Sequence, residues 1–241
     1  KTWNIGERHI KGSRNPSDIS KVSEDIVIEN VYMLQTKDRT GHSDSNPDYI
    51  GGIDMMMTRN LTIRDCVAEG IRGQQNGGRA AIFLWQGQEN ITIERNIIIG
   101  CAKGIALGNP SRPFGNIVTG NWHADGAIIR NNFILRGQWT TGDNIAFELC
   151  STKNIRVYNN TIYSEDASYF RTVSIYDCTA KGPTDNVILG YNIIRGRIKD
   201  YTDGKGWSLV GNIQDGIGTT VTADWFIDPA NADFHLTANA T

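Results

Sequence analysis

The sequence has few cysteines and few prolines, and this limits the kinds of site and fold that it can encode. Its four cysteines, Cys66, Cys101, Cys150 and Cys178, form no CxxC pair and no zinc-ligand spacing. Each lies in or beside an apolar strand pattern, so we expect small buried side chains, with a disulfide between neighbouring turns left open. The 6 prolines against 26 glycines exclude a proline-rich linker and suit a fold with many tight corners.

Long apolar runs and a charge excess are also missing. No run approaches the length of a membrane span, and no signal peptide is present, so we expect no membrane insertion. The net charge of −2 gives no basic surface for nucleic acid, which we therefore exclude as a partner. Hydrophobic residues at 39% and charged residues at 21% argue against disorder.

One sequence motif, which consists of two short strands around a polar corner, recurs along the chain. It occupies residues 26–31, 61–67, 91–97, 127–133, 155–162 and 187–193, with a weak last copy at 208–213. Alternation at period two puts Ile91 and Ile93 on one face and Thr92 on the other. Internal repeats of this length are typical of solenoids.

The corner of each repeat holds an asparagine in the same register. Asn96, Asn132, Asn160 and Asn192 would lie one above another in stacked turns, about 4.8 Å apart. Their side-chain amides would then hydrogen-bond along the column. Cys66 occupies this position in an early turn, so we expect the ladder to be interrupted there.

A second strand family precedes each repeat, at residues 52–57, 81–85, 104–108, 144–149 and 172–176. The intervening segments hold no apolar stripe long enough for a crossover helix, and hairpin turns at sandwich spacing are absent. We therefore predict an all-β chain, a right-handed parallel β-helix of about seven coils with variable loops on one face. The β-helix would span residues 25–213, after a lead-in or incomplete cap at 1–24 and before a closing segment at 214–241.

Several segments of the sequence resemble those of a known superfamily. They are residues 104–108, 123–134, 142–149 and 157–162, with 226–229 and 233–236 near the end. They are similar to the pectate-lyase-like parallel β-helices, specifically the secreted bacterial right-handed parallel β-helix repeat proteins. The resemblance implies a secreted or cell-surface location and a polysaccharide or oligosaccharide partner. The superfamily includes lyases, glycoside hydrolases, esterases, epimerases and non-catalytic adhesins, so the fold alone does not select a reaction.

The outward side of the second strand family is the predicted binding face. If Ile53, Ile105 and Phe147 face inward, their neighbours face outward: Asp54, Met56, Phe83, Trp85, Ala106, Ala146 and Glu148, with Tyr176 one coil further on. Sugars stack on aromatic rings while polar groups bind their hydroxyls. We expect Trp85, Phe83, Tyr176 and Asp54 to contact substrate. The alternative is that Phe83 and Trp85 pack under a neighbouring loop.

The insertion at residues 108–127 is expected to overhang this face with Arg112, Trp122, His123 and Asp125, and Asp143 and Glu148 lie one coil beyond. We expect Arg112 and Trp122 to contact substrate as well. A hydrolase needs two carboxyl groups, for which Asp125, Asp143 and Glu148 are candidates. A lyase needs a base and a cation, which His123, Arg112, Lys103 or a bound Ca²⁺ would supply. The alternatives are that Asp125 forms a turn with Gly126 and that His123 makes only a polar contact.

The loop at residues 38–48 carries three carboxylates, and Asp54 follows. Calcium binds six to eight oxygens, so Asp44 and Asp48 are candidate ligands, although the spacing does not match an EF-hand and a solvated loop explains the same residues. The sequence thus predicts a protein that cleaves a polysaccharide by lyase or hydrolase chemistry. The alternative is a non-catalytic glycan-binding or adhesin solenoid, and the oligomeric state stays open.

Overall fold

The computed structural model describes residues 1–12, 17–37, 47–111, 116–138, 141–177, 182–216, 220–231 and 233–240. The chain is nearly all β, and these residues contain no α-helix, only the 3-10 turns η1 (Ile19–Lys21), η2 (Ala223–Trp225) and η3 (Pro229–Asn231). Within the same residues, no helix is long and apolar enough to span a membrane. The all-β class predicted from the sequence is confirmed.

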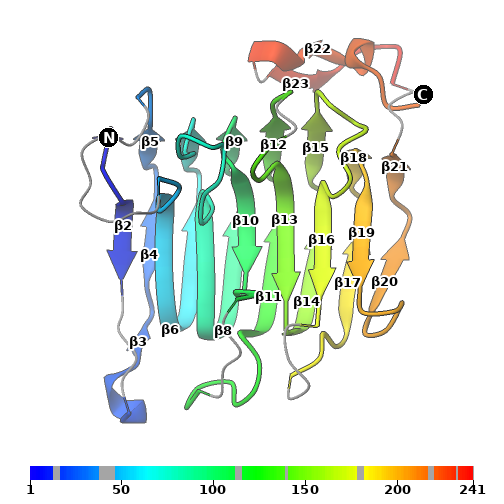
Figure 1. Ribbon diagram of the computed structural model, residues 1–241. Helices are drawn as coiled ribbons and strands as arrows, with labels where there is room; N and C mark the ends of the chain where they lie inside the picture. Colours follow the sequence, from blue (N-terminus) through cyan, green and yellow to red (C-terminus); the bar gives the residue numbers. More distant parts are fainter. Residues whose placement is uncertain are drawn as a thin grey trace.

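Two parallel sheets form three faces of a stack, because the larger sheet turns a corner within β6 (Gly51–Arg64) and β8 (Ile82–Glu94). The first parts of these long strands pair with β2 and β10, and their last parts pair with β4 and β11. Each turn of the chain adds one strand to each face, and successive turns lie side by side (Figure 1).

The remaining strands are assigned to the faces as follows. Face 1 continues with β2 (Arg8–Gly12), β10 (Lys103–Leu107), β13 (Ile145–Cys150), β16 (Val173–Tyr176) and β19 (Ile198–Tyr201). Face 2 contains β3 (Ser23–Glu24), β4 (Val27–Glu29), β11 (Ala124–Arg130), β14 (Thr152–Tyr158), β17 (Val187–Gly190) and β20 (Trp207–Val210). Face 3 contains β1 (Thr2–Trp3), β5 (Tyr32–Leu34), β7 (Val67–Glu69), β9 (Ile97–Ile99), β12 (Phe133–Arg136), β15 (Thr161–Ser164), β18 (Ile193–Arg195) and β21 (Ile213–Asp215).

One continuous apolar core fills the space between the three faces. It takes Phe147 from face 1, Ile129 from face 2 and Ile134 from face 3, each essentially buried. Eight of the nine inward positions predicted for the second strand family belong to this core: Ile53, Met55, Ile82, Leu84, Ile105, Leu107, Phe147 and Leu149. The ninth, Ile145, is fully buried but is not part of this core. This burial of apolar side chains is the main stabilising term of the fold.

Ala146 is an exception to the predicted alternation, because it packs in the core and does not face outward. The carbonyl of Thr172 accepts hydrogen bonds from both Ala146 N and Phe147 N, at 2.7 and 3.4 Å. This shared acceptor marks an irregularity at the start of β13, and such irregularities shift the side-chain alternation locally. The prediction of an outward Ala146 was therefore wrong.

The predicted asparagine ladder is confirmed. Asn96 Nδ2 donates to Asn132 Oδ1 at 3.0 Å, Asn132 Nδ2 to Asn160 Oδ1 at 2.9 Å, and Asn160 Nδ2 to Asn192 Oδ1 at 2.9 Å. The ladder runs one turn further, to Asn212 Oδ1 at 2.8 Å. At the other end, Cys66 Sγ replaces the amide and donates to the carbonyl of Arg64 at 3.2 Å. The ladder satisfies backbone groups that the corner would otherwise bury unpaired.

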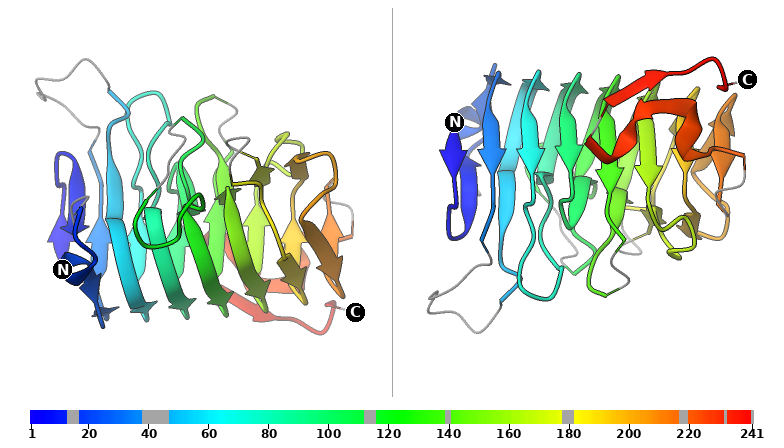
Figure 2. Two further views of the ribbon diagram at one scale, coloured as in Figure 1. Left: turned by 90° about the horizontal axis from the view of Figure 1, so that it is seen from below. Right: turned by 90° about the horizontal axis from the view of Figure 1, so that it is seen from above.

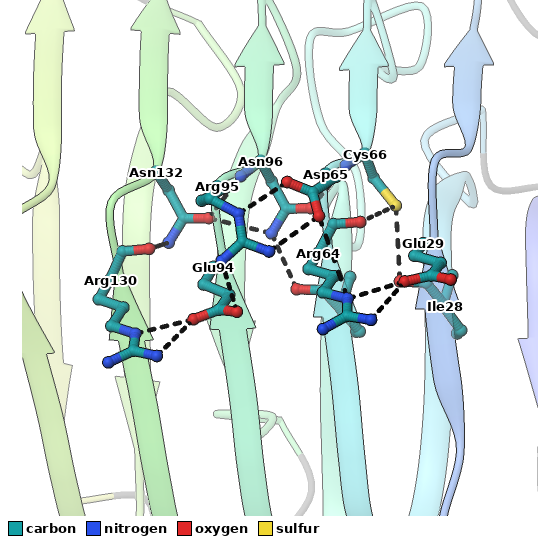
Figure 3. A network of polar contacts seen from close by, with 11 residues as sticks. Ile28, Glu29, Arg64, Asp65, Cys66, Glu94, Arg95, Asn96, Arg130 and Asn132 are labelled. Carbon is teal, nitrogen blue, oxygen red and sulfur yellow. Dashed lines mark hydrogen bonds and ion pairs between the residues drawn. The ribbon is translucent and has the colours of Figure 1, made fainter.

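A charge ladder lies beside the asparagine ladder on face 2 (Figure 3). Glu29, Arg64, Glu94 and Arg130 occupy one register column, so that negative and positive side chains alternate. Arg64 binds Glu29 at 2.7 Å, and Arg130 binds Glu94 at 2.7 Å. Arg95 joins the next column, because it binds both Asp65, at 2.8 Å, and Glu94, at 2.7 Å. Opposite charges on neighbouring strands stabilise the observed register.

The two ends of the chain are built differently. Residues 1–24, the predicted lead-in, contain β1, β2 and β3, which pair in parallel with β5 and β6. The last residues form the antiparallel hairpin β22 (Phe226–Asp228) and β23 (Asp233–Leu236), which lies over face 3 (Figure 2). Phe226 and Phe234 pack there with Leu135 and Tyr163 in a second apolar cluster. The closing segment therefore covers a face of the stack.

Candidate functional site

Face 1 carries a polar pocket of about 190 Å³ in the middle of the stack. It is lined by Arg79, Phe83, Lys103, Asn109, Pro110, Ser111, Glu148, Arg171 and Tyr176. A second hollow of about 380 Å³ adjoins it, because both contain Arg79 and Lys103. Asp48, Gly77, Gly78, Gly142 and Asp143 complete the second hollow.

Small side chains beside Glu148 open the pocket. In the outward column of face 1, Ala106 and Ser174 flank Glu148 on the neighbouring strands β10 and β16. Neither reaches far above the sheet, so a depression remains between the taller Phe83 and Tyr176. The turn after β10, at Asn109 to Ser111, forms one wall, as expected for the start of the insertion.

Two acidic side chains meet on one ammonium group at the pocket floor. Lys103 Nζ donates to both oxygens of Glu148, at 2.9 Å each, and lies 3.8 Å from Asp143 Oδ2. Arg171 Nη2 donates to Asp143 Oδ1 at 3.2 Å, and Arg171 Nη1 donates to the hydroxyl of Tyr176 at 3.0 Å. The structure thus brings together Asp143, Glu148 and Tyr176 of the predicted site residues.

The charges of this cluster set its protonation. Burial disfavours the Lys103 ammonium, but the carboxylates of Glu148 and Asp143 outweigh it and raise the pKa of Lys103. Burial likewise opposes the charge of Arg171, yet hydrogen bonds with Tyr169 and Tyr176 raise its pKa. Burial, followed by the charge of Glu148, raises the pKa of Tyr176. At neutral pH Lys103 and Arg171 are therefore charged, and the phenol of Tyr176 is protonated.

Aromatic pairs flank the pocket along face 1. Phe83 and Trp85 stack on one side, with ring centroids 5.4 Å apart and an interplanar angle of 15°. Tyr176 and Tyr201 stack on the other, at 4.4 Å and 5°. Trp85 lies on β8 and Tyr176 on β16, three strand spacings apart, which corresponds to about 14 Å.

Asp54 occupies the same outward column but is 1% exposed. Its Oδ2 accepts from Arg8 Nε at 2.7 Å and from Lys11 Nζ at 3.3 Å, and its Oδ1 accepts from Trp85 Nε1 at 3.1 Å. The carboxylate is thus enclosed by protein groups. Of Asp54 and Trp85, both predicted to contact substrate, Trp85 is the accessible one.

His123, Trp122 and Asp125 lie away from the pocket. His123 is buried where faces 1 and 2 meet, and its Nδ1 accepts the backbone N–H of Gln86 at 3.2 Å. Trp122 donates to the carbonyl of Pro183 at 3.0 Å and packs under Lys153. Asp125 belongs to face 2, where it accepts from Asn154 at 2.7 Å. These residues stabilise corners of the fold.

The remaining candidates are Arg112, the possible calcium ligands and the cysteines. Arg112, Asp44 and Cys178 lie outside the described residues. Asp48 lines the second hollow and accepts the backbone N–H of Gln75 at 3.0 Å. The described part of the chain contains no group of three or more His, Cys, Asp or Glu side chains that could hold a metal ion.

The cysteines divide into two kinds. Cys66 and Cys101 are free and buried, as expected, whereas Cys150, at the end of β13, is disulfide-bonded. Cys150 is also buried, as expected, and its bond answers the question of a disulfide that the sequence left open. A residue pattern cannot reveal such a bond, because it depends on the spatial approach of a second sulfur.

Arg79 and Arg171 were not among the predicted site residues. A signal for them exists, since Arg79, Lys103 and Arg171 each lie at or just before the first residue of a face 1 strand. Stacking of the turns brings these three cationic side chains to one corner of the fold. The position of these side chains therefore follows from the repeat, although strand alternation alone does not indicate it.

No protein-family model matches the chain, and no curated protein and no solved structure matches it significantly.

Proposed function

We propose that this chain is a right-handed parallel β-helix of the pectate-lyase-like kind, secreted or displayed at the cell surface, that binds a polysaccharide along face 1. The three stacked faces and the asparagine ladder support the fold assignment. The disulfide at Cys150 supports an oxidising compartment.

The observation that carries the function is a charged pocket between two stacked aromatic pairs. Trp85 and Tyr176 provide apolar rings on which sugars stack. Lys103, Arg171 and Arg79 provide hydrogen-bond donors between them for hydroxyl or carboxylate groups. An oligosaccharide extended across the strands of face 1 would reach both rings and the pocket.

Elimination fits the pocket better than hydrolysis. A hydrolase needs one carboxylic acid that keeps its proton and donates it to the leaving oxygen. Here Lys103 engages both oxygens of Glu148, and Asp143 lies between Lys103 and Arg171. Both carboxyl groups therefore act as acceptors for cationic side chains. An elimination instead uses cations, to stabilise the charge that develops on a sugar carboxylate.

The proposed reaction assigns one role to each residue. Lys103 and Arg79 bind the uronate carboxylate, and Asp143 takes the proton from the adjacent carbon, as carboxylate bases do in other enolising enzymes. The electrons of that C–H bond form a C=C double bond while the glycosidic C–O bond breaks. Tyr176 gives its proton to the leaving oxygen. Arg171 holds Asp143 and Tyr176 together through its two nitrogens.

A second candidate function is glycan binding without cleavage. It is favoured by the closed pairing of Glu148 with Lys103, since a bidentate pair that is 3% exposed on the acidic side serves equally as a rigid floor for a binding pocket. Both candidate functions use the same aromatic rings, so the formation of a cleavage product is what distinguishes them.

The test is a screen of acidic and neutral polysaccharides with the wild type. Reducing ends and the ultraviolet absorbance of unsaturated uronate would be followed together. Both signals are expected to rise on an acidic substrate, and Tyr176→Phe and Asp143→Asn are expected to lower the rate at least about 100-fold with binding retained. Asp125→Asn, a matched change on face 2, should leave the rate unchanged. Reducing ends without the absorbance would contradict elimination, and binding without product would favour the second candidate.

A further inference from the structure

The indole of Trp85 is held by a buried ionic group. Asp54 is 1% exposed, and its side chain lies between Trp85 and the basic residues of β2. Trp85 Nε1 donates to Asp54 Oδ1 at 3.1 Å, while Arg8 Nε, at 2.7 Å, and Lys11 Nζ, at 3.3 Å, bind the other oxygen. Each carboxylate oxygen therefore has its own partners, and no ligand is needed to satisfy Asp54.

This hydrogen bond fixes the plane of the indole. A tryptophan side chain has two rotatable bonds, and its ring here is restrained on one side by Phe83, at 5.4 Å and 15°. Phe83 itself is buried against Ala80 and Ala106 and lines the pocket. Removing the acceptor would free the indole to rotate away from Phe83 and would leave Arg8 buried without its carboxylate.

Arg8 also contacts an aromatic ring that Arg79 of the pocket contacts. The guanidinium of Arg8 lies 4.2 Å from the ring centroid of Tyr49, and that of Arg79 lies 5.2 Å from the same ring. Arg79 lines both hollows of the site. Asp54 thus anchors Arg8, whose contact with Tyr49 extends toward Arg79.

We propose that Asp54 is a positioning residue of the glycan site: through the indole N–H it sets the orientation of Trp85, without touching the ligand itself. This inference rests on the proposed function for its effect on binding, but the orientation of Trp85 can be measured without any ligand. Strand β2 would therefore contribute to the binding site indirectly, because its Arg8 and Lys11 bind the carboxylate of Asp54.

The first experiment records the indole N–H signals of the six tryptophans in a ¹H–¹⁵N spectrum of the full chain. The Trp85 signal is identified by its loss in Trp85→Phe. Asp54→Ala is expected to move this signal strongly, whereas Lys11→Met should move it little, because Arg8 still holds the carboxylate. An unchanged Trp85 signal in folded Asp54→Ala would overturn the proposal, whatever the ligand is.

The second experiment is a double-mutant cycle on affinity for sodium polygalacturonate and sodium alginate. Asp54→Ala is expected to weaken binding about tenfold, and to weaken it no further when added to Trp85→Phe. Independent, multiplying effects would mean that Asp54 acts by another route and would overturn the proposal. If the wild type binds none of the polysaccharides screened, the proposed function fails, while the indole spectrum still decides the role of Asp54.

Discussion

Replacing Asn132 with alanine tests how much the asparagine ladder contributes to stability. Asn132 is fully buried, and its Nδ2 donates to the carbonyl of Ile93, the carbonyl of Arg130 and Asn160 Oδ1, at 3.1, 3.0 and 2.9 Å. Its Oδ1 accepts from both N and Nδ2 of Asn96, at 3.0 Å each. Alanine removes all five contacts and leaves the buried backbone N–H of Asn96 without an acceptor.

A buried donor or acceptor left unpaired costs about 1–3 kcal/mol, so we expect Asn132→Ala to lower the free energy of unfolding by about 3–5 kcal/mol. Asn212→Ala is the matched control. It removes three contacts from a half-buried end of the ladder, and we expect a loss of about 1 kcal/mol.

The assay is urea unfolding followed by circular dichroism, with comparison of midpoints at an unchanged slope. A loss for Asn132→Ala below about 1 kcal/mol, or no larger than that for Asn212→Ala, would refute the reasoning that ladder amides satisfy the buried corners.

Three further perturbations probe other parts of the fold. Cys66→Asn should raise the free energy of unfolding by about 0.5–1 kcal/mol in thermal melts, because an amide would replace weak sulfur contacts at the ladder end, and Cys66→Ala should not. Glu94→Gln should cost about 1–2 kcal/mol at neutral pH in urea unfolding. Burial opposes the ionised Glu94, but Arg130 and Arg95 outweigh it and lower its pKa, so this stabilisation is present above the unfolded-state value near 4.5 and is lost as pH falls through the folded-state pKa. The difference between wild type and variant should therefore shrink in acid, and a constant difference would contradict this assignment. Phe234→Ala should weaken the packing of the C-terminal hairpin on face 3 by about 2–4 kcal/mol, so that limited proteolysis cuts the hairpin before the stack unfolds. Simultaneous loss of the hairpin and the stack would contradict the view that the hairpin docks as a separate unit.

The fold features predicted from the sequence were those that depend on a repeated local pattern. Asparagines in one register must meet when turns stack, so the contacts of Asn96, Asn132, Asn160 and Asn192 followed from spacing alone. Alternation at period two likewise gave the inward set of face 1. It failed at Ile145 and Ala146 because one shared carbonyl, that of Thr172, shifts the alternation at the start of β13.

The candidate site was harder to predict because some of its residues lie on strands and others lie in the corners between strands. Glu148 and Tyr176 lie on regular strands, and their outward placement follows from the strand pattern. His123 and Asp125 lie at the end of the insertion, where the chain turns between faces 1 and 2, and Asp125 therefore belongs to another face. Arg171 reaches the pocket from a corner, whose path no periodicity describes.

The alternating charges on face 2 bear on how the chain avoids assembling incorrectly. Turns that resemble one another can pair with the wrong neighbour during folding, and skipping one turn is the error that a repeat invites. In this chain a skipped turn would place Glu29 against Glu94, or Arg64 against Arg130, in the same column. Like charges directly opposite on paired strands repel, so the misassembled form is penalised at the first wrong contact. The alternation of charge from one turn to the next would thus favour pairing between the correct neighbours during folding.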